Sequence, residues 1–266
     1  GVDLPAEIKR REDRLAAIAT AKAKIEARAK ERFEREQAEY EAKMAKRKAK
    51  QASTGKKPGG KPPKPPQTGP QAEDQINLTD EDSRIMKVAG GGFEQCYNAQ
   101  AVVDTESMLV VAPHITTAGN DKEQVAPMLE CIQALPDGLN QPTRLLADTG
   151  FYSERNVQHC HDAGVEPLIA VGRDAHHPDW RSRFEEPAPL ATPTSHVEQM
   201  KHALKTQAGR AAYALRKQTV EPVFGIIKSV MGFRQFLLRG VGNVRNKWTL
   251  VCLAWNFKRM AVLRLQ

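Results

Sequence analysis

Two acidic residues, Asp148 and Glu221, stand where a carboxylate could bind a metal ion. Asp148 directly follows the apolar run 144–147 and precedes Thr149-Gly150-Phe151. Ligand sites in α/β sheets gather where the chain leaves a strand, and an acid at such a point can hold a divalent cation. The alternative is that Asp148 only starts the turn or caps the following helix.

Glu221 is the only acidic residue among the last 66 residues, which contain 13 Lys and Arg. Phosphodiester cleavage with hard cations needs carboxylates to bind the metal ions and cations to hold the phosphates. A single Glu in this setting could equally form an ion pair with a neighbouring arginine. The cations nearest to it in the sequence are Arg210, Arg216, Lys217 and Lys228.

Charge is distributed unevenly along the chain. Residues 1–66 carry a net charge of +9, residues 67–200 carry −13 and residues 201–266 carry +12. Basic segments attract nucleic-acid phosphates by releasing counterions, without sequence specificity. No run of about 20 apolar residues is present to span a bilayer, so we expect a cytoplasmic protein that binds DNA.

The N-terminal part differs in composition from the rest. Residues 5–51 are rich in Ala, Glu, Lys and Arg, which favours a helix, and their sparse apolar residues suit a long hairpin or a partly coiled helix. Residues 53–70 are rich in Pro, Gly and Lys, which predicts a flexible or polyproline-type linker. We therefore expect a charged helical arm (1–52), a linker (53–75) and a globular domain (76–266).

The globular part shows the alternation of an α/β domain. Residues 96–104 and 108–114 predict a hairpin. Further along, the pattern predicts a helix over 121–135, a strand over 144–147, a helix from Ser153 to about Ala163, a strand over 165–171, a loop over about 173–195 and helices from Val197 onward. Such an order implies a mixed sheet covered by helices on both faces.

Two other runs have a simpler structural interpretation. Gly90-Gly91-Gly92 follows no predicted strand, so a phosphate-binding loop is not expected there. An apolar helical stretch near the C-terminus predicts core packing; it contains Trp248, Leu250, Val251, Leu253 and Trp255.

Four ordered motifs resemble the DDE transposases of bacterial insertion sequences, and in particular a subgroup with a long charged helical insertion in its catalytic domain. They are Asn77 to Lys87, Tyr97-Asn98-Ala99-Gln100, Leu146 to Phe151 and Val220 to Lys228. The similarity extends to Leu4-Pro5 and the region of Arg10 to Lys30. This resemblance implies a ribonuclease H-like fold, in which three acids on two strands and a helix bind two Mg²⁺ or Mn²⁺ ions.

The resemblance also assigns roles to single residues. Asp148 matches the second acid of the family, and Glu221 matches the third. Tyr213, Arg216, Glu221 and Lys228 match a family signature of Tyr, Arg, Glu and Lys, whose cations and tyrosine would contact DNA. One residue more than usual separates Arg216 from Glu221, so either Arg216 or Lys217 can take the arginine's place.

The first acid of the family has no match. Its Asp-Gly-Thr motif occurs nowhere in the chain, and the resemblance places the first residues of the chain within the helical insertion. We therefore expect a C-terminal fragment that lacks the first strand and the first acid. Asp80, Asp82 and Asp104 are the alternatives for this acid, although turn or hairpin roles explain each of them more simply.

The expected function is DNA transposition by metal-dependent strand cleavage and transfer at insertion-sequence ends, with activity of this chain in question. The expected partners are the element ends and the target DNA, bound by a homo-oligomer in the nucleoid. The main alternative is a non-catalytic fragment that binds transposon ends or full-length transposase. A third possibility is a helical interaction protein, which buried and salt-bridged motifs would favour.

Overall fold

A computed structural model describes residues 3–88, 90–172, 184–190 and 195–264 of the chain. It contains two compact units, Gly1–Glu81 and Asp82–Gln266. Within the described ranges, no helix is long and apolar enough to cross a bilayer.

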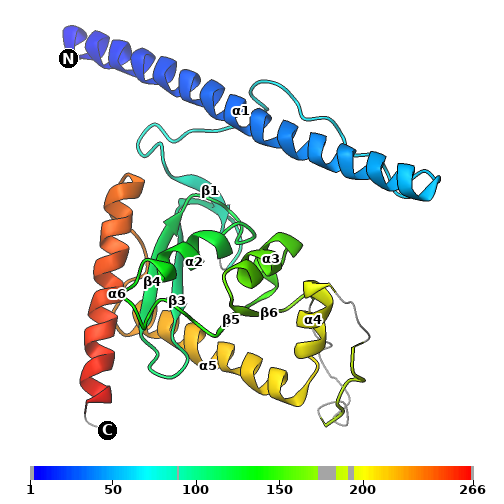
Figure 1. The fold of residues 1–266 in the computed structure, drawn as a ribbon. Helices are drawn as coiled ribbons and strands as arrows, with labels where there is room; N and C mark the ends of the chain where they lie inside the picture. Colours follow the sequence, from blue (N-terminus) through cyan, green and yellow to red (C-terminus); the bar gives the residue numbers. More distant parts are fainter. Residues whose placement is uncertain (1–2, 89, 173–183, 191–194, 265–266) are drawn as a thin grey trace. The chain divides into compact units, whose positions relative to one another are not determined.

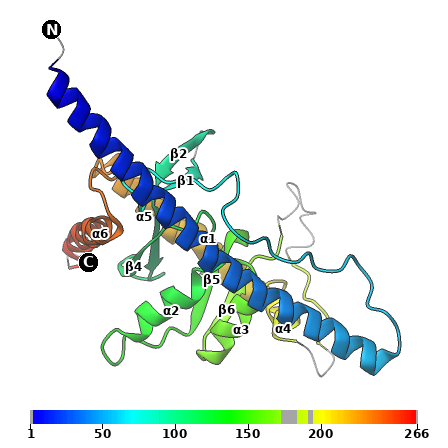
Figure 2. The same cartoon turned by 90° about the horizontal axis from the view of Figure 1, so that it is seen from above.

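The first unit is built on one uninterrupted helix, α1 (Leu4–Thr54), which Figures 1 and 2 show along its whole length. The side chain of Asp3 caps its first turn, and Gly55, with φ 66°, ends it in the left-handed conformation that glycine adopts without strain. The predicted helix over 5–51 is confirmed as a single helix rather than a hairpin.

The Pro- and Gly-rich segment that follows α1 runs back beside this helix (Figures 1 and 2). The guanidinium of Arg47 donates hydrogen bonds to the carbonyl oxygens of residues 58–60. Arg32 forms an ion pair with Asp74. Arginines of the helix thus satisfy backbone groups of a segment that has no regular structure of its own. The predicted linker is therefore docked on the arm within this unit.

The described strands of the second unit form three separate two-stranded sheets. β1 (Arg84–Lys87) pairs antiparallel with β2 (Phe93–Cys96), β3 (Asn98–Val103) antiparallel with β4 (Val110–Thr116), and β5 (Arg144–Ala147) parallel with β6 (Glu166–Ile169). Helices and strands alternate as an α/β fold requires, but the described strands do not form the single mixed sheet that was predicted. Neither β3 nor β5 has a second neighbour among them.

The prediction that the three glycines follow no strand was wrong. Gly90, Gly91 and Gly92 precede β2 in the β1–β2 hairpin, with φ values of 94°, 92° and 95°. An L side chain rarely adopts this left-handed backbone, whereas glycine does so freely. The glycines therefore belong to a tight connection between two short strands.

The predicted helices are present with shifted ends. They are α2 (Val125–Gln133), α3 (Glu154–Asp162), α4 (His196–Ala203), α5 (Gln207–Ser229) and α6 (Val241–Leu263). A short 3-10 turn, η1 (Thr149–Phe151), was not predicted as a separate element. The hydroxyl of Ser153 accepts a hydrogen bond from the backbone amide of Asn156 and caps α3 as predicted. Most of the predicted loop over 173–195 lies outside the described residues.

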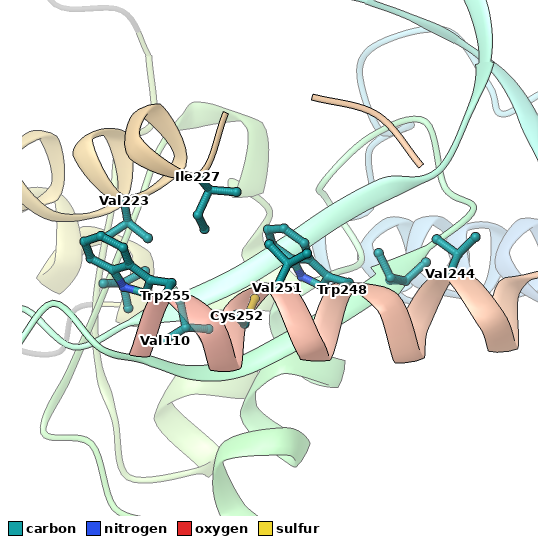
Figure 3. Packing of buried hydrophobic residues seen from close by; sticks show 10 residues of the cluster. Val110, Val223, Ile227, Val244, Trp248, Val251, Cys252 and Trp255 are labelled. Carbon is teal, nitrogen blue, oxygen red and sulfur yellow. The ribbon is translucent and has the colours of Figure 1, made fainter. Parts of the chain in front are cut away.

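The largest hydrophobic core forms where α5 and α6 meet the β3–β4 hairpin (Figure 3). The indole of Trp248 donates a hydrogen bond to the carbonyl oxygen of Gln100 at 2.8 Å, so the buried ring has a partner for its N–H. Val251 and Trp255 are buried beside it as predicted. Leu250 and Leu253 are exposed, contrary to prediction, because they lie on the face of α6 that points away from this core.

A second set of contacts holds the turn that follows β5. The buried amide of Asn156 on α3 donates to the carbonyl oxygens of Lys122, at 2.7 Å, and Phe151, at 2.6 Å. Phe151 ends η1, the turn that begins directly after Asp148. One side chain of α3 therefore fixes both this turn and the segment that leads into α2.

Candidate functional site

Asp148 lies where the sequence predicted it, immediately after β5. Its Oδ1 accepts a hydrogen bond from the backbone N–H of Gly150 at 2.8 Å, which caps η1. Its Oδ2 lies 4.0 Å from a terminal nitrogen of Arg216, and the side chain is 50% exposed. Asp148 therefore does cap η1, through its Oδ1. Its Oδ2 remains directed toward the guanidinium of Arg216.

Glu221 lies on α5, whose buried face carries Val223 and Ile227. Its Oε1 is 3.3 Å from the other terminal nitrogen of Arg216, and its side chain is 56% exposed. The next residue, Pro222, stands inside the helix and brings no backbone donor. The glutamate thus points away from the core, with one oxygen paired.

Arg216 joins these two acids. It lies five residues before Glu221 on α5, and its side chain is only 18% exposed. Its guanidinium carbon is 5.8 Å from the centroid of the Tyr213 ring, within reach of a cation–π interaction. Its Nε is buried and has no hydrogen-bond acceptor among the described residues. The structure therefore brings Asp148, Glu221, Arg216 and Tyr213 into one cluster, which we call the carboxylate pair site.

Lys217 and Lys228 do not belong to this cluster. Both are exposed on α5. The ammonium of Lys228 lies 5.8 Å from the centre of the Phe224 ring. Of the two candidates for the arginine of the family signature, Arg216 is the one that contacts the acids, whereas Lys217 faces solvent.

A third carboxylate near Asp148 was not predicted. The Oδ1 of Asp121 accepts hydrogen bonds from the amides of Asn98, at 2.8 Å, and Gln100, at 2.7 Å. A Cβ added at Gly150 would lie 3.0 Å from Asp148 Oδ1 and 3.4 Å from Asp121 Oδ2. Glycine at position 150 therefore leaves room for two carboxylates that come from distant parts of the chain.

A signal for Asp121 was present in the sequence. Asn98 and Gln100 belong to the motif Tyr97 to Gln100, and residues two apart in a strand point to the same face. Two amides on one face of β3 indicate a shared polar partner, because buried amides rarely lack one. The pattern cannot say which acid that partner is.

The alternatives for the first acid hold other parts of the fold together. Asp82 Oδ2 accepts from the backbone N–H of Val241 at 3.0 Å, where α6 begins. Asp104 accepts from the backbone and the hydroxyl of Ser107 in the β3–β4 turn, at 2.7 and 2.6 Å. Burial would raise the pKa of Asp104, but these hydrogen bonds and those from the amides of residues 105–106 outweigh it and lower the pKa. Asp80 belongs to the first unit.

The chemistry of the pair fits a hard divalent cation in part. Asp148 and Glu221 offer carboxylate oxygens, the ligands that Mg²⁺ prefers, and a cationic group already lies between them. Among the described residues, no three His, Cys, Asp or Glu side chains are placed to hold one metal ion together. The pair can therefore supply two protein ligands to such an ion, with water completing its coordination.

The part of the chain that follows Glu221 is basic, and most of its cations are exposed. Exposed cations follow Glu221 on α5, the connection to α6 and α6 itself; they include Lys228, Arg234, Arg239, Arg245, Lys247 and Lys258. No other acid is present after residue 200. A polyanion is therefore attracted to this part of the second unit.

Comparisons with known proteins give one match. No curated protein and no solved structure matches the chain. A family model described as "Transposase DDE domain" matches residues 66–257, which include Asp148, Arg216 and Glu221 and leave the whole of α1 outside. The match covers well over half of the chain, and the chain therefore belongs to the transposase DDE domain family.

Proposed function

We propose that this transposase domain acts at the ends of an insertion sequence, with Asp148 and Glu221 as ligands of a catalytic divalent cation. The single observation that carries the proposal is the convergence of the two acids, from β5 and from α5, on one guanidinium. Residues that are 73 positions apart in the chain meet at one point, in the order that the family motifs imply.

Mg²⁺ or Mn²⁺, when bound, would polarise a phosphate oxygen and lower the pKa of a water molecule. The residues of this chain would bind the ion and hold the DNA. Asp148 and Glu221 would hold the ion at the edge of β5. Lys217 and Lys228 would hold the DNA backbone by charge. Tyr213 would stack on a base or support the backbone beside the cut.

We further propose a ribonuclease H-like arrangement that needs one more strand. β3 and β5 each have one neighbour among the described strands, and unpaired strand edges readily accept another strand. A strand between them would unite the β3–β4 and β5–β6 pairs in a single sheet. It would also be the place for the family's first acid, because Asp82 and Asp104 already have structural partners. Two ions, strand transfer and a homo-oligomer on nucleoid DNA remain predictions.

The test is Mn²⁺ binding to the full chain, measured by calorimetry. Asp148→Asn and Glu221→Gln should each weaken binding at least tenfold, since each removes one of two charged ligands. Glu130→Gln is the matched control, because Glu130 is exposed on α2 and outside the carboxylate pair site. Equal Mn²⁺ affinity in the wild type and in both site variants contradicts the proposal.

A second candidate function is DNA binding without cleavage, by a domain that lacks the first of the family's three acids. The observation that favours it is the incomplete set of carboxylates in the described residues. A cleavage assay on element ends with Mg²⁺ or Mn²⁺ separates the two functions. It compares this chain with a version extended upstream to include Asp-Gly-Thr, and cleavage by the extended version alone would show that the chain needs the extra strand.

A further inference from the structure

Arg216 lies between the two acids that the proposed function assigns to a metal ion. Its two terminal nitrogens face Oδ2 of Asp148, at 4.0 Å, and Oε1 of Glu221, at 3.3 Å. A divalent cation shared by the same two carboxylates would lie close to this guanidinium. Like charges at such a distance repel each other, and partial burial strengthens the repulsion. The guanidinium and the ion are therefore alternatives for the same pair of acids.

The surroundings of Arg216 argue against a permanent DNA contact. Its side chain is mostly buried, unlike that of Lys217, which follows it and is exposed. Both of its terminal nitrogens are directed toward acids of the same chain. A phosphate that bound this guanidinium would therefore compete with the two acids for it.

In its present position, the Arg216 side chain leaves one hydrogen-bond donor, its Nε–H, without a partner among the described residues. This N–H is buried, and a buried donor without an acceptor is costly. An arginine that gives up both acids therefore loses two ion pairs but gains solvent for its Nε. The Tyr213 ring, 5.8 Å away, borders the guanidinium on another side.

We propose that Arg216 is the resident counter-cation of the carboxylate pair site, and that a divalent metal ion must displace its guanidinium to bind Asp148 and Glu221 together. This inference rests on the proposed function, because it takes the pair as the metal site. It assigns Arg216 the role of a competitor for the acids: the guanidinium balances the charge of the two carboxylates until the ion replaces it.

The test compares neutral and charged replacements of Arg216 in the full chain, again by Mn²⁺ binding at low salt. Arg216→Gln should tighten Mn²⁺ binding about tenfold, because a competing positive charge about 4 Å away is removed. Arg216→Lys keeps the charge and should bind Mn²⁺ with nearly the wild-type affinity. Lys201→Gln is the control: it removes the same charge from an exposed position on α4, outside the carboxylate pair site, and should change the affinity less than twofold.

The direction in which the Mn²⁺ affinity changes in Arg216→Gln tests the inference. A purely structural arginine predicts weaker Mn²⁺ binding in Arg216→Gln, because the acids would drift apart; that result, or no change, overturns the inference. A permanent phosphate contact predicts instead that Arg216→Gln flattens the salt dependence of metal-free DNA binding as much as Lys217→Gln does. That result would also overturn it.

A measurement on the wild type covers the case in which Arg216→Gln does not fold. The Nε–H of Arg216 should exchange slowly with water in the metal-free protein, since it is buried, and quickly after Mg²⁺ is added. An unchanged nitrogen NMR signal at saturating Mg²⁺ contradicts displacement. Failure of the proposed function is recognised separately, because Asp148→Asn and Glu221→Gln would then leave Mn²⁺ binding unaffected.

Discussion

Two regions of the second unit, the α6 interface and the carboxylate pair site, differ in how far their side chains are buried. Where α6 meets the β3–β4 hairpin, two indoles are buried and each donates a hydrogen bond to a backbone carbonyl oxygen. Around the carboxylate pair site, two acids are about half exposed, and one arginine connects them. The first region excludes water and satisfies its polar groups, whereas the second keeps charged groups accessible.

This contrast separates stability from chemistry within a single unit. Apolar burial supplies most of the folding free energy, and the α6 interface contains the largest cluster of buried apolar side chains among the described residues. Ion pairs near the surface contribute little. Changes at the α6 interface should therefore destabilise the fold, and changes at the acids should alter ligand binding with little effect on the fold.

The largest effect is expected from Trp248→Ala. The substitution removes a buried ring that contacts Phe224, Phe233 and Phe236, and it should lower the free energy of unfolding by about 3–5 kcal/mol. Chemical denaturation measures this change. Leu250→Ala is the control on the same helix: Leu250 is 61% exposed, and its removal should cost less than about 0.5 kcal/mol. Equal losses would mean that α6 does not pack as described.

A smaller effect is expected from Asn256→Ala. The Asn256 side chain accepts from the N–H of Val110 and donates to its carbonyl oxygen, both at 2.8 Å. Its removal leaves two groups of a buried residue without partners and should cost about 1–3 kcal/mol. Asn246→Ala, on an exposed position of the same helix, is the control. Hydrogen exchange of the Val110 amide should accelerate only in Asn256→Ala.

The smallest effect on stability is expected from Glu221→Gln. Its ion pair with Arg216 is more than half exposed on the glutamate side, so the free energy of unfolding should change by about 1 kcal/mol or less. Thermal unfolding without metal measures this change. A loss as large as that of Trp248→Ala would show that the carboxylate pair site is part of the structural framework, and the contrast between the two regions would then be lost.

Local sequence patterns were sufficient for much of the secondary structure. The composition of residues 5–51 predicted α1, and the cap at Ser153 predicted the start of α3. Asp148 was expected at the end of a short strand and lies there. These features depend on neighbours within one or two turns of the chain, so their causes can be seen in a short stretch of sequence.

Local sequence patterns predicted less well which side chains are buried and which elements pack against each other. Leu250 and Leu253 were expected in the core, yet they are exposed, because α6 is apolar on both faces and periodicity could not select the buried one. The pairing of β1 with β2 was missed because Phe93, in β2, is exposed and the strands are short. The position of Asp121 beside Gly150 depends on contacts between β3 and the loop before α2.

By itself, the sequence determined the residues available for chemistry and their order: Asp148 after a strand, and Glu221 alone in a basic segment. It also narrowed the arginine of the signature to Arg216 or Lys217. Only the tertiary structure distinguished these two, since their side chains leave α5 in different directions and only that of Arg216 meets β5. The physical reason is that helical periodicity is a local property, whereas an ion pair between α5 and the end of β5 exists only after the chain has folded.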